Sequence, residues 1–207
     1  LFAWAPIERI KQTFKNTLRL ARRGVSPTNR MKKFYRSPNP AANVKRRSEA
    51  VVVDMVYFNV PQLYGGFTKA MFYCGVQSLY ASLHGVESGS STAFLGTLQE
   101  EVRKRGAMSK LISDRGTNIV SKQVIDFLRT LFIDNWQSEP LYQHQNGAER
   151  RYQDVKANTE RTLSRVGAPA TFAFLCMLWI IYVMNHTAMA ILGWKTPMQM
   201  LEGQVPN

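Results

Sequence analysis

Three acidic residues, each in or beside an apolar run, constrain this chain more than any other feature. Asp54 interrupts the β-branched run Ala50–Tyr57, Asp114 ends the apolar run that begins at Lys110, and Glu149 opens a helical pattern. A carboxylate within a buried strand is costly unless it has a partner. A metal cation can neutralise several such acids at once. The three positions therefore predict one shared metal site built from separate elements.

The order of strand and helix patterns is typical of a mixed α/β domain. Runs rich in β-branched and aromatic residues predict strands over residues 50–58, 69–76, 78–84, 108–113 and 132–136. Apolar residues spaced three and four apart predict helices that end near Gly106 and Leu131, and two more over residues 147–166 and 170–192. The polar residues between 137 and 146 should form a loop.

The helix predicted over residues 147–166 should have two different faces. Its core-facing positions are Ala148, Tyr152, Val155, Thr159, Thr162 and Val166. The opposite edge carries Glu149, Gln153, Lys156 and Glu160. An acid, an amide and a lysine would therefore lie along one exposed edge.

Positive charge is concentrated at the N-terminal end of the chain. Of the net charge of +13, residues 1–50 supply +11 and residues 51–207 supply +2. This division predicts a basic helix and linker over residues 1–48 and a core domain over residues 49–207. A basic arm is typical of a protein with a polyanion partner. A solvated, partly disordered leader would have the same composition.

The arm itself divides into a helical part and a linker. Pro6 suits the first turn of a helix, and an apolar stripe then recurs at Ile7, Ile10, Phe14, Leu18 and Ala21. Residues 28–48 have no periodicity and predict a linker that lies loosely on the core or follows a phosphate backbone. Arg46 and Arg47, at the end of this linker, are candidate DNA contacts.

Cysteine usage and hydropathy exclude two classes of protein. Cys74 and Cys176 lie in apolar runs without neighbouring metal ligands, so buried free thiols are expected and a zinc module is not. The uninterrupted apolar segment 172–184 is too short to span a bilayer, which takes about 20 residues. A core-facing or dimer-facing helix is favoured, and no membrane partner is expected.

The sequence motifs around the three acids resemble those of the catalytic core of retroviral-type integrases. Asp54, Asp114 and Glu149 occur in that family's order, with the last two 35 positions apart, and residues 113–116 and 146–147 also match. The resemblance narrows to integrases of copia-type LTR retrotransposons through segments 104–107, 110–114, 131–133, 136–140, 144–146, 148–151, 167–169 and 185–186. One departure is visible, since the family usually has two residues where this chain has only Ala148 before the Glu.

The resemblance implies an RNase H-like fold, in which a five-stranded mixed sheet is flanked by helices. It also implies a polynucleotidyl transferase in which Asp54, Asp114 and Glu149 are catalytic and bind two Mg²⁺ or Mn²⁺ ions. Two such ions about 4 Å apart clamp the attacking and leaving oxygens of a phosphodiester. Asp54 should bridge both ions, and the other two acids should bind one each. The expected reactions are 3′-end processing of element DNA and strand transfer into target DNA.

DNA contacts and partners are implied in the same way. Lys156 matches a family position that grips the DNA end, and phosphate neutralisation is the main use of Lys beside such a site. Gln153, Asn146 and Thr117 are weaker candidates for the same surface. The expected partners are element-end DNA and target DNA, with assembly into a homo-oligomer. The chain is expected to act in the nucleus after release from a larger polyprotein.

Two other interpretations stay open. The same acids could serve an RNase H or a transposase-type nuclease, which cleavage of an RNA–DNA hybrid would identify. The chain could also be a catalytically inactive DNA-binding relic. The presence of all three acids argues against a relic, and a strand-joining assay would decide.

Overall fold

The computed structural model describes residues 2–17, 37–113, 121–137 and 147–203. Its centre is a sheet with the strand order β3-β2-β1-β4-β5. The strands are β1 (Ala50–Tyr57), β2 (Lys69–Gly75), β3 (Ala81–Val86), β4 (Lys110–Ser113) and β5 (Asp134–Gln137). β1, β2 and β3 form an antiparallel meander, whereas β4 and β5 run parallel to β1. The five-stranded mixed sheet predicted from the sequence is confirmed.

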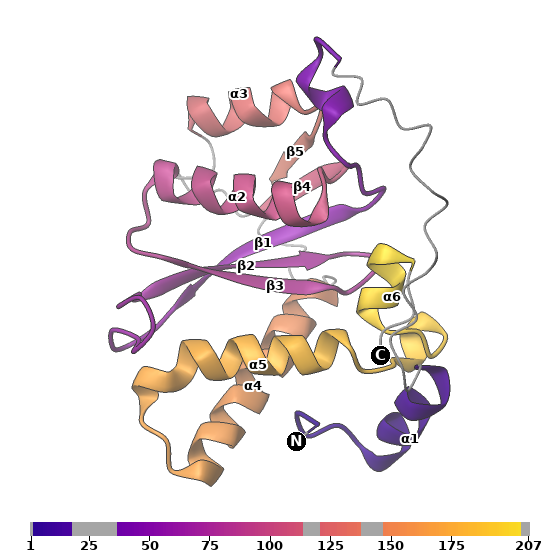
Figure 1. Cartoon of the computed structure of the whole chain (residues 1–207). Coiled ribbons are helices and arrows are strands. Elements are labelled where there is room, and N and C mark those ends of the chain that lie inside the picture. Colours follow the sequence, from indigo (N-terminus) through magenta and orange to yellow (C-terminus); the bar gives the residue numbers. More distant parts are fainter. Residues whose placement is uncertain (1, 18–36, 114–120, 138–146, 204–207) are drawn as a thin grey trace, which may run out of the picture.

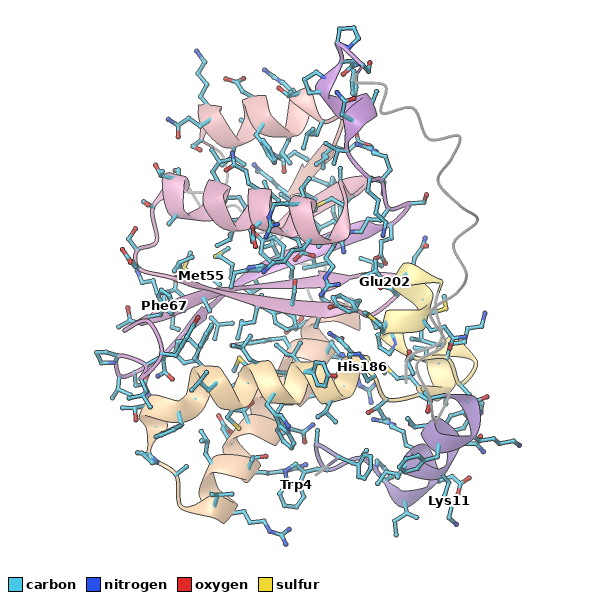
Figure 2. All side chains as sticks on the ribbon, viewed as in Figure 1. Trp4, Lys11, Met55, Phe67, His186 and Glu202 are labelled. Atoms are coloured by element: carbon cyan, nitrogen blue, oxygen red, sulfur yellow. The ribbon has the colours of Figure 1, made fainter. Side chains whose placement is uncertain are left out.

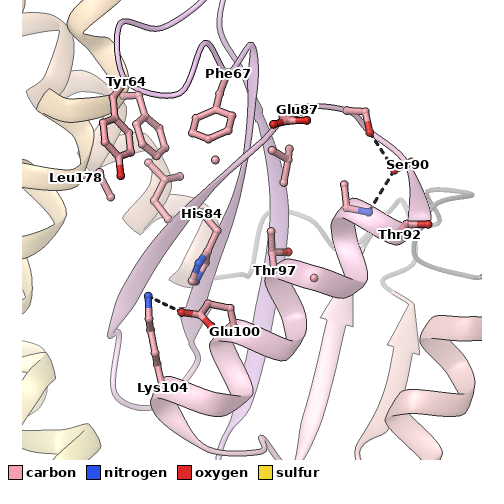
Figure 3. Close-up of a pocket in the computed structure, with 17 residues that line it drawn as sticks. Tyr64, Phe67, His84, Glu87, Ser90, Thr92, Thr97, Glu100, Lys104 and Leu178 are labelled. Atoms are coloured by element: carbon pink, nitrogen blue, oxygen red, sulfur yellow. Dashed lines mark hydrogen bonds and ion pairs between the residues drawn. The ribbon is translucent and has the colours of Figure 1, made fainter.

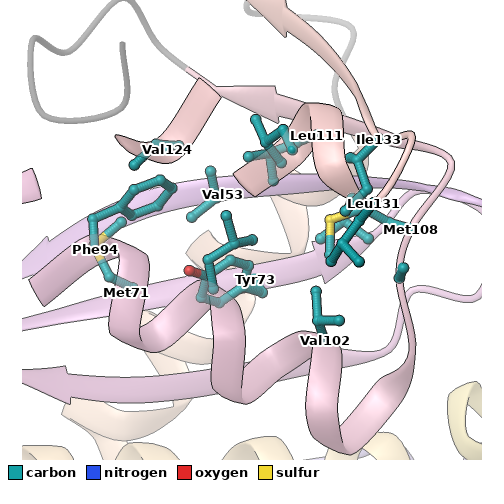
Figure 4. Close-up of a cluster of buried hydrophobic side chains, with 14 of the residues drawn as sticks. Val53, Met71, Tyr73, Phe94, Val102, Met108, Leu111, Val124, Leu131 and Ile133 are labelled. Carbon is teal, nitrogen blue, oxygen red and sulfur yellow. The ribbon is translucent and has the colours of Figure 1, made fainter. Parts of the chain in front are cut away.

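Helices cover both faces of this sheet (Figure 1). One face carries α2 (Ser91–Arg105) and α3 (Lys122–Thr130), and the other carries α4 (Gly147–Val166) and α5 (Ala173–Asn185). The apolar cluster under α2 and α3 includes Val53, Tyr73, Phe94, Leu111 and Val124 (Figure 4). The cluster under α4 and α5 includes Val56, Phe72, Val155, Phe174 and Ile180. Because successive residues of a strand point to opposite faces, the continuous apolar run of β1 marks a strand buried on both sides.

Capping residues fix both ends of α2. The Ser90 hydroxyl accepts a hydrogen bond of 3.2 Å from the backbone N–H of Ala93, which caps the first turn. Gly106 follows the last turn with a φ of +96°, and a Cβ there would lie 2.8 Å from the carbonyl oxygen of Lys45. Only glycine meets both conditions without strain. The predicted end of this helix at Gly106 is confirmed.

The N-terminal helix α1 (Ile7–Asn16) docks on the core through polar rather than apolar residues. Thr13 is buried, and its hydroxyl accepts a hydrogen bond of 2.9 Å from the backbone N–H of Ala188. Trp4 precedes the helix and donates from Nε1 to the Thr162 hydroxyl at 3.1 Å (Figure 2). Of the apolar stripe predicted for this helix, Ile7 is 73% exposed and Phe14 is 63% exposed, Ile10 is half-buried, and Leu18 and Ala21 lie outside the described residues.

The C-terminal elements differ in extent from the sequence prediction. The helix expected over residues 170–192 is α5, which is preceded by the short η4 (Ala170–Phe172) and ends at Asn185. The Asn185 amide donates to the Ala81 carbonyl at 2.7 Å and accepts from the Ala81 N–H at 3.0 Å, so it joins this end of the helix to β3. The remaining short elements are η2 (Pro40–Asn43), η5 (Ala190–Leu192) and α6 (Pro197–Glu202). No helix in the described part of the chain is long and apolar enough to cross a bilayer.

α4 has the two faces predicted for it, with two corrections. Val155 and Thr159 are buried, and Tyr152 and Thr162 are half-buried. Val166 is 73% exposed instead of core-facing, because the last turns of α4 run away from the sheet (Figure 1). Arg151 is buried, which the sequence pattern of this helix does not predict.

Candidate active site

Asp54 lies in β1 on the face of the sheet that α4 covers. It pairs across the antiparallel ladder with Phe72 of β2, which belongs to the apolar cluster under α4 and α5. Val56, two residues further along β1, belongs to the same cluster. Asp54 itself is exposed, and its Oδ1 accepts a hydrogen bond of 2.7 Å from the N–H of Met55. The strand therefore presents this carboxylate to solvent at the edge of an otherwise apolar face.

The first turns of α4 lie over the same part of the sheet. The Tyr152 ring packs on the Phe72 ring with 5.3 Å between centroids. Burial raises the pKa of Tyr152, and the negative charge of Asp54 raises it further. Glu149 lies about one turn before Tyr152 and is exposed, and its Oε1 accepts a hydrogen bond of 3.4 Å from the Gln153 amide. Asp54 and Glu149 therefore open on the same side of the sheet.

The third predicted acid, Asp114, lies outside the described residues. β4 runs parallel to β1 and its last residue, Ser113, pairs with Val53, directly before Asp54. Two of the weaker DNA-binding candidates, Thr117 and Asn146, also lie outside the described residues, as does the loop before the helix.

The donor atoms at this site suit a hard divalent cation. Asp54 and Glu149 offer exposed carboxylate oxygens, the ligand type that Mg²⁺ and Mn²⁺ take. Within the described ranges, no group of three or more His, Cys, Asp or Glu side chains could hold a metal ion. The two described acids thus fit part of a carboxylate site whose predicted third member is Asp114.

The exposed edge of α4 agrees with the sequence analysis. All four side chains predicted to form this edge are exposed: Glu149, Gln153, Lys156 and Glu160. Lys156 is seven residues after Glu149, so the two side chains are about two turns apart on the same edge. This arrangement places a cation where it can reach a phosphate bound beside the acids.

Arg46 and Arg47, predicted as DNA contacts, both make contacts within the fold, but Arg46 is exposed and its DNA contact stays a prediction. The Arg46 guanidinium donates to the carbonyl oxygens of Leu131 and Phe132, the second at 3.0 Å, and so caps the C-terminal end of α3. Arg47 is only 7% exposed. The prediction for Arg47 is therefore corrected, because a buried guanidinium cannot contact a phosphate at the surface.

Arg47 belongs to a buried charge cluster that the sequence analysis missed. Its Nη2 lies 3.3 Å from Glu101 Oε1, and its Nη1 lies 4.0 Å from Glu49 Oε1. Glu101 Oε2 also accepts from the Ser82 hydroxyl at 2.7 Å and contacts His84 Nε2 at 3.1 Å. Burial opposes ionisation of Glu101, but His84, Arg47 and Ser82 together hold its pKa below the usual value. The only sequence signal was an acid on the apolar stripe of α2.

A groove of about 810 Å³ runs along the free edge of β3, between α2 and α5 (Figure 3). Tyr64, Phe67 and Leu178 line one end, and His84, Glu100 and Lys104 line the other. None of the predicted site residues lines this groove. It is therefore a separate surface from the acids of β1 and α4.

Comparison with known proteins identifies chains whose structures are similar to this one. No protein-family model matches the sequence, and no curated protein matches it. The simian T-cell lymphotropic virus intasome, solved in complex with a PP2A regulatory subunit, contains a similar chain at 15% identity with a TM-score of 0.62. That match covers 79% of this chain and 60% of the viral one, so this chain spans less than two thirds of its length.

Isolated catalytic cores give similar matches. The HTLV-2 integrase catalytic core domain in complex with magnesium matches at 14% identity with a TM-score of 0.57, over 75% of this chain and 97% of that one. The BIV integrase catalytic core domain matches at 15% identity with a TM-score of 0.58, over 75% and 94%. The sheet order and the flanking helices are therefore those of a known architecture: the chain has the RNase H-like fold of retroviral integrase catalytic cores.

Proposed function

We propose that this chain is the catalytic core of an integrase, closest in kind to those of copia-type LTR retrotransposons. Its activity would be polynucleotidyl transfer: 3′-end processing of element DNA and strand transfer into target DNA. The observation that carries the proposal is the placement of Asp54 and Glu149 as exposed acids on one side of an integrase-type sheet. Asp114, which directly follows β4, is the third acid of the proposed site.

Each residue of the proposed site would have its own role in phosphodiester transfer. Two Mg²⁺ or Mn²⁺ ions, when bound, would supply the activated oxygen nucleophile and stabilise the leaving oxygen. Asp54, held on a central strand, would contribute to both ion positions, and Asp114 and Glu149 would contribute to one each. Lys156 would neutralise a phosphate of the element's DNA end, and Gln153 would hydrogen-bond to the same backbone. The rigid helix α4 would keep the acid and the lysine in fixed register.

The proposed partners are element-end DNA, target DNA and further copies of the chain. The basic arm, residues 1–48, would add contacts without sequence preference, as Lys11 and Lys15 on α1 are exposed. Four large exposed apolar side chains, which favour self-association there, lie on α5 or directly before it: Phe172, Leu175, Trp179 and Tyr182. HTLV-2 integrase cores have been solved in dimeric and trimeric forms. We further propose action in the nucleus after release from a larger polyprotein.

The test separates metal binding from DNA binding along one edge of α4. Glu149→Gln keeps the shape of the side chain but removes the charge, so it should abolish trimming and joining while DNA affinity stays the same or rises. Lys156→Ala should weaken binding of DNA ends and lower the slope of log affinity against log salt by about one unit. At saturating DNA its chemical step should survive. Glu160→Gln, on the same exposed edge, is the matched control and should keep both properties.

Two results would reject the assignment. If Lys156→Ala stops the chemical step as fully as Glu149→Gln does, the roles given to the two residues are wrong. If Glu149→Gln stays active, another acid completes the site, and Asp154 is the first to replace. Cleavage of an RNA–DNA hybrid without any strand joining would favour the nuclease alternative.

A further inference from the structure

Arg151, two residues after Glu149 on α4, is a buried cation whose hydrogen-bonding capacity is largely unused. Its side chain is 3% exposed. Nη1 donates to Met189 Sδ at 3.5 Å, a weak acceptor, while Nε and Nη2 have no hydrogen-bond partner in the described part of the chain. Burying a charged group without partners is strongly unfavourable. An anion bound to this guanidinium would offset that cost.

The described residues around Arg151 do not provide a negative charge that pairs with its guanidinium. No ion pair to Arg151 forms among the described residues, in contrast to Arg47, which lies between two carboxylates. Cys74 is completely buried, and burial raises the pKa of its thiol to about 12, so it is neutral at pH 7. Among the described residues, the exposed Asp154 favours the charged form of Arg151 and so raises its pKa, whereas the positive charge of Arg9 of α1 lowers it. The positive charges of Arg151 and Arg9 would therefore both attract an anion bound at the buried Arg151 guanidinium.

The two unused nitrogens have a chemically specific geometry. Nε and Nη2 form one edge of the planar guanidinium, and their N–H groups point in parallel, a fork that matches two oxygens of a phosphate or a carboxylate. The second positive charge, from Arg9, favours an anion of charge −2 over one of charge −1. Phosphate is the class of anion that meets both conditions.

The Nε–Nη2 edge of Arg151 lies near the N-terminal arm. Arg151 contacts Met189 after α5, and it interacts electrostatically with Cys74 of β2 and with Arg9 of α1. Two polar contacts hold the arm there, Thr13 to Ala188 and Trp4 to Thr162. The Arg165 guanidinium also lies 5.1 Å from the Trp4 ring. Because these nitrogens are shielded from solvent, an anion can reach them only when a neighbouring element moves.

We propose that the seam between α1 and α4 is a binding site for a phosphate group, held by the Nε–Nη2 edge of Arg151 and by the charge of Arg9. The phosphate comes either from free inorganic phosphate or from a nucleic-acid backbone that enters when α1 lifts. Binding would tie the arm to the core, because the two arginines that share the anion belong to the two parts.

The experiment measures thermal unfolding of the full chain in phosphate-free buffer at constant ionic strength, with inorganic phosphate titrated in. The wild type should show a Tm that rises with phosphate by mass action. Arg151→Met should lose this response and be at least as stable as the wild type without phosphate, because it replaces an unpaired buried cation by an apolar side chain of similar length. Arg161→Met, which replaces an exposed arginine on the same helix, is the control and should keep the full response.

Arg9→Gln gives a second reading that does not depend on a buried substitution. It should raise the half-saturating phosphate concentration several-fold without preventing folding. A parallel titration with duplex DNA distinguishes the sources: a DNA response that Arg151→Met abolishes identifies a backbone phosphate, and one that it keeps identifies the free anion. The proposal is overturned if phosphate leaves the wild-type Tm unchanged, if Arg151→Met responds equally, or if acetate stabilises as strongly as phosphate.

Discussion

Replacing Arg47 by Met should destabilise the fold through the two acids that it leaves behind. Arg47 Nη2 lies 3.3 Å from Glu101 and its Nη1 lies 4.0 Å from Glu49, and both acids are buried. Removing one partner of a buried ion pair costs about 3–5 kcal/mol. Both acids keep other partners, since Glu49 accepts from Ser78 at 2.9 Å and Glu101 contacts His84. We therefore expect a loss of about 3 kcal/mol, a large share of the stability of an ordinary domain.

The loss of unfolding free energy in Arg47→Met should depend on pH. The folded-state pKa of Glu101 is lowered, so its contribution is present above the usual glutamate range and is lost as the pH falls through the folded value. In Arg47→Met, burial is opposed by fewer charges, so Glu101 should take up a proton at a higher pH than in the wild type. The difference in unfolding free energy should therefore be largest near neutral pH and shrink on acidification.

Urea unfolding followed by tryptophan fluorescence at several pH values measures this difference. The control is Arg103→Met, which removes an exposed arginine that pairs with Glu100 on the surface of α2 and should change the midpoint little. A double variant, Arg47→Met with Glu101→Gln, should recover part of the loss. An Arg47→Met midpoint equal to that of the control, or a difference that does not change with acid, would refute the account of the cluster.

Three further outcomes follow from the structure. Gly75→Ala should lose about 1–3 kcal/mol in urea unfolding, because its Cβ would lie 2.5 Å from Ser78 Oγ; an unchanged midpoint would contradict this contact. Trp4→Ala removes the hydrogen bond to Thr162, so residues 2–17 should become sensitive to protease while the core stays resistant, and uniform resistance would show that the arm docks by other contacts. Chelation by EDTA should stop strand joining without changing the circular dichroism spectrum, and joining that continues in EDTA would exclude the proposed metal chemistry.

Local sequence patterns predicted most of the fold. β1 could be predicted because Val51, Val53 and Val56 are β-branched and buried on one face or the other, and the end of α2 could be predicted because of Gly106. The predicted third strand began at Ser78, whereas β3 begins at Ala81. The reason is a long-range contact, since the N–H and hydroxyl of Ser78 bind Glu49 and hold a turn there.

Tertiary contacts account for the other differences. α5 ends at Asn185 because that side chain pairs with the backbone of Ala81, a contact between distant segments. The apolar stripe of α1 did not predict its buried side, because one threonine, Thr13, anchors the helix. Burial of Arg47 and Arg151 also depends on which distant residues surround them, so composition alone could describe them only as basic.

The candidate site was predicted as three converging acids, of which Asp54 and Glu149 lie in the described part of the chain and share a side of the sheet. Glu149 is exposed on the predicted edge of α4 together with Lys156 and Gln153, whereas Asp54, which the sequence analysis treated as an acid within a buried strand, is exposed as well. The spacing of the acids along the chain gives their order, but not their approach in space. The packing of Tyr152 on Phe72 positions α4 over β1, and nothing in the sequence pairs these two rings.

Strand transfer by the purified full chain tests the central claim most directly. Duplexes that carry the ends of the proposed parent element are incubated with a plasmid target and Mg²⁺ or Mn²⁺, and joined products are counted for the wild type, Asp54→Asn and Glu160→Gln. The account predicts joining by the wild type and Glu160→Gln, and none by Asp54→Asn, with DNA binding retained by all three. Joining by Asp54→Asn at the wild-type rate, or DNA binding by the wild type without any joining, would contradict it.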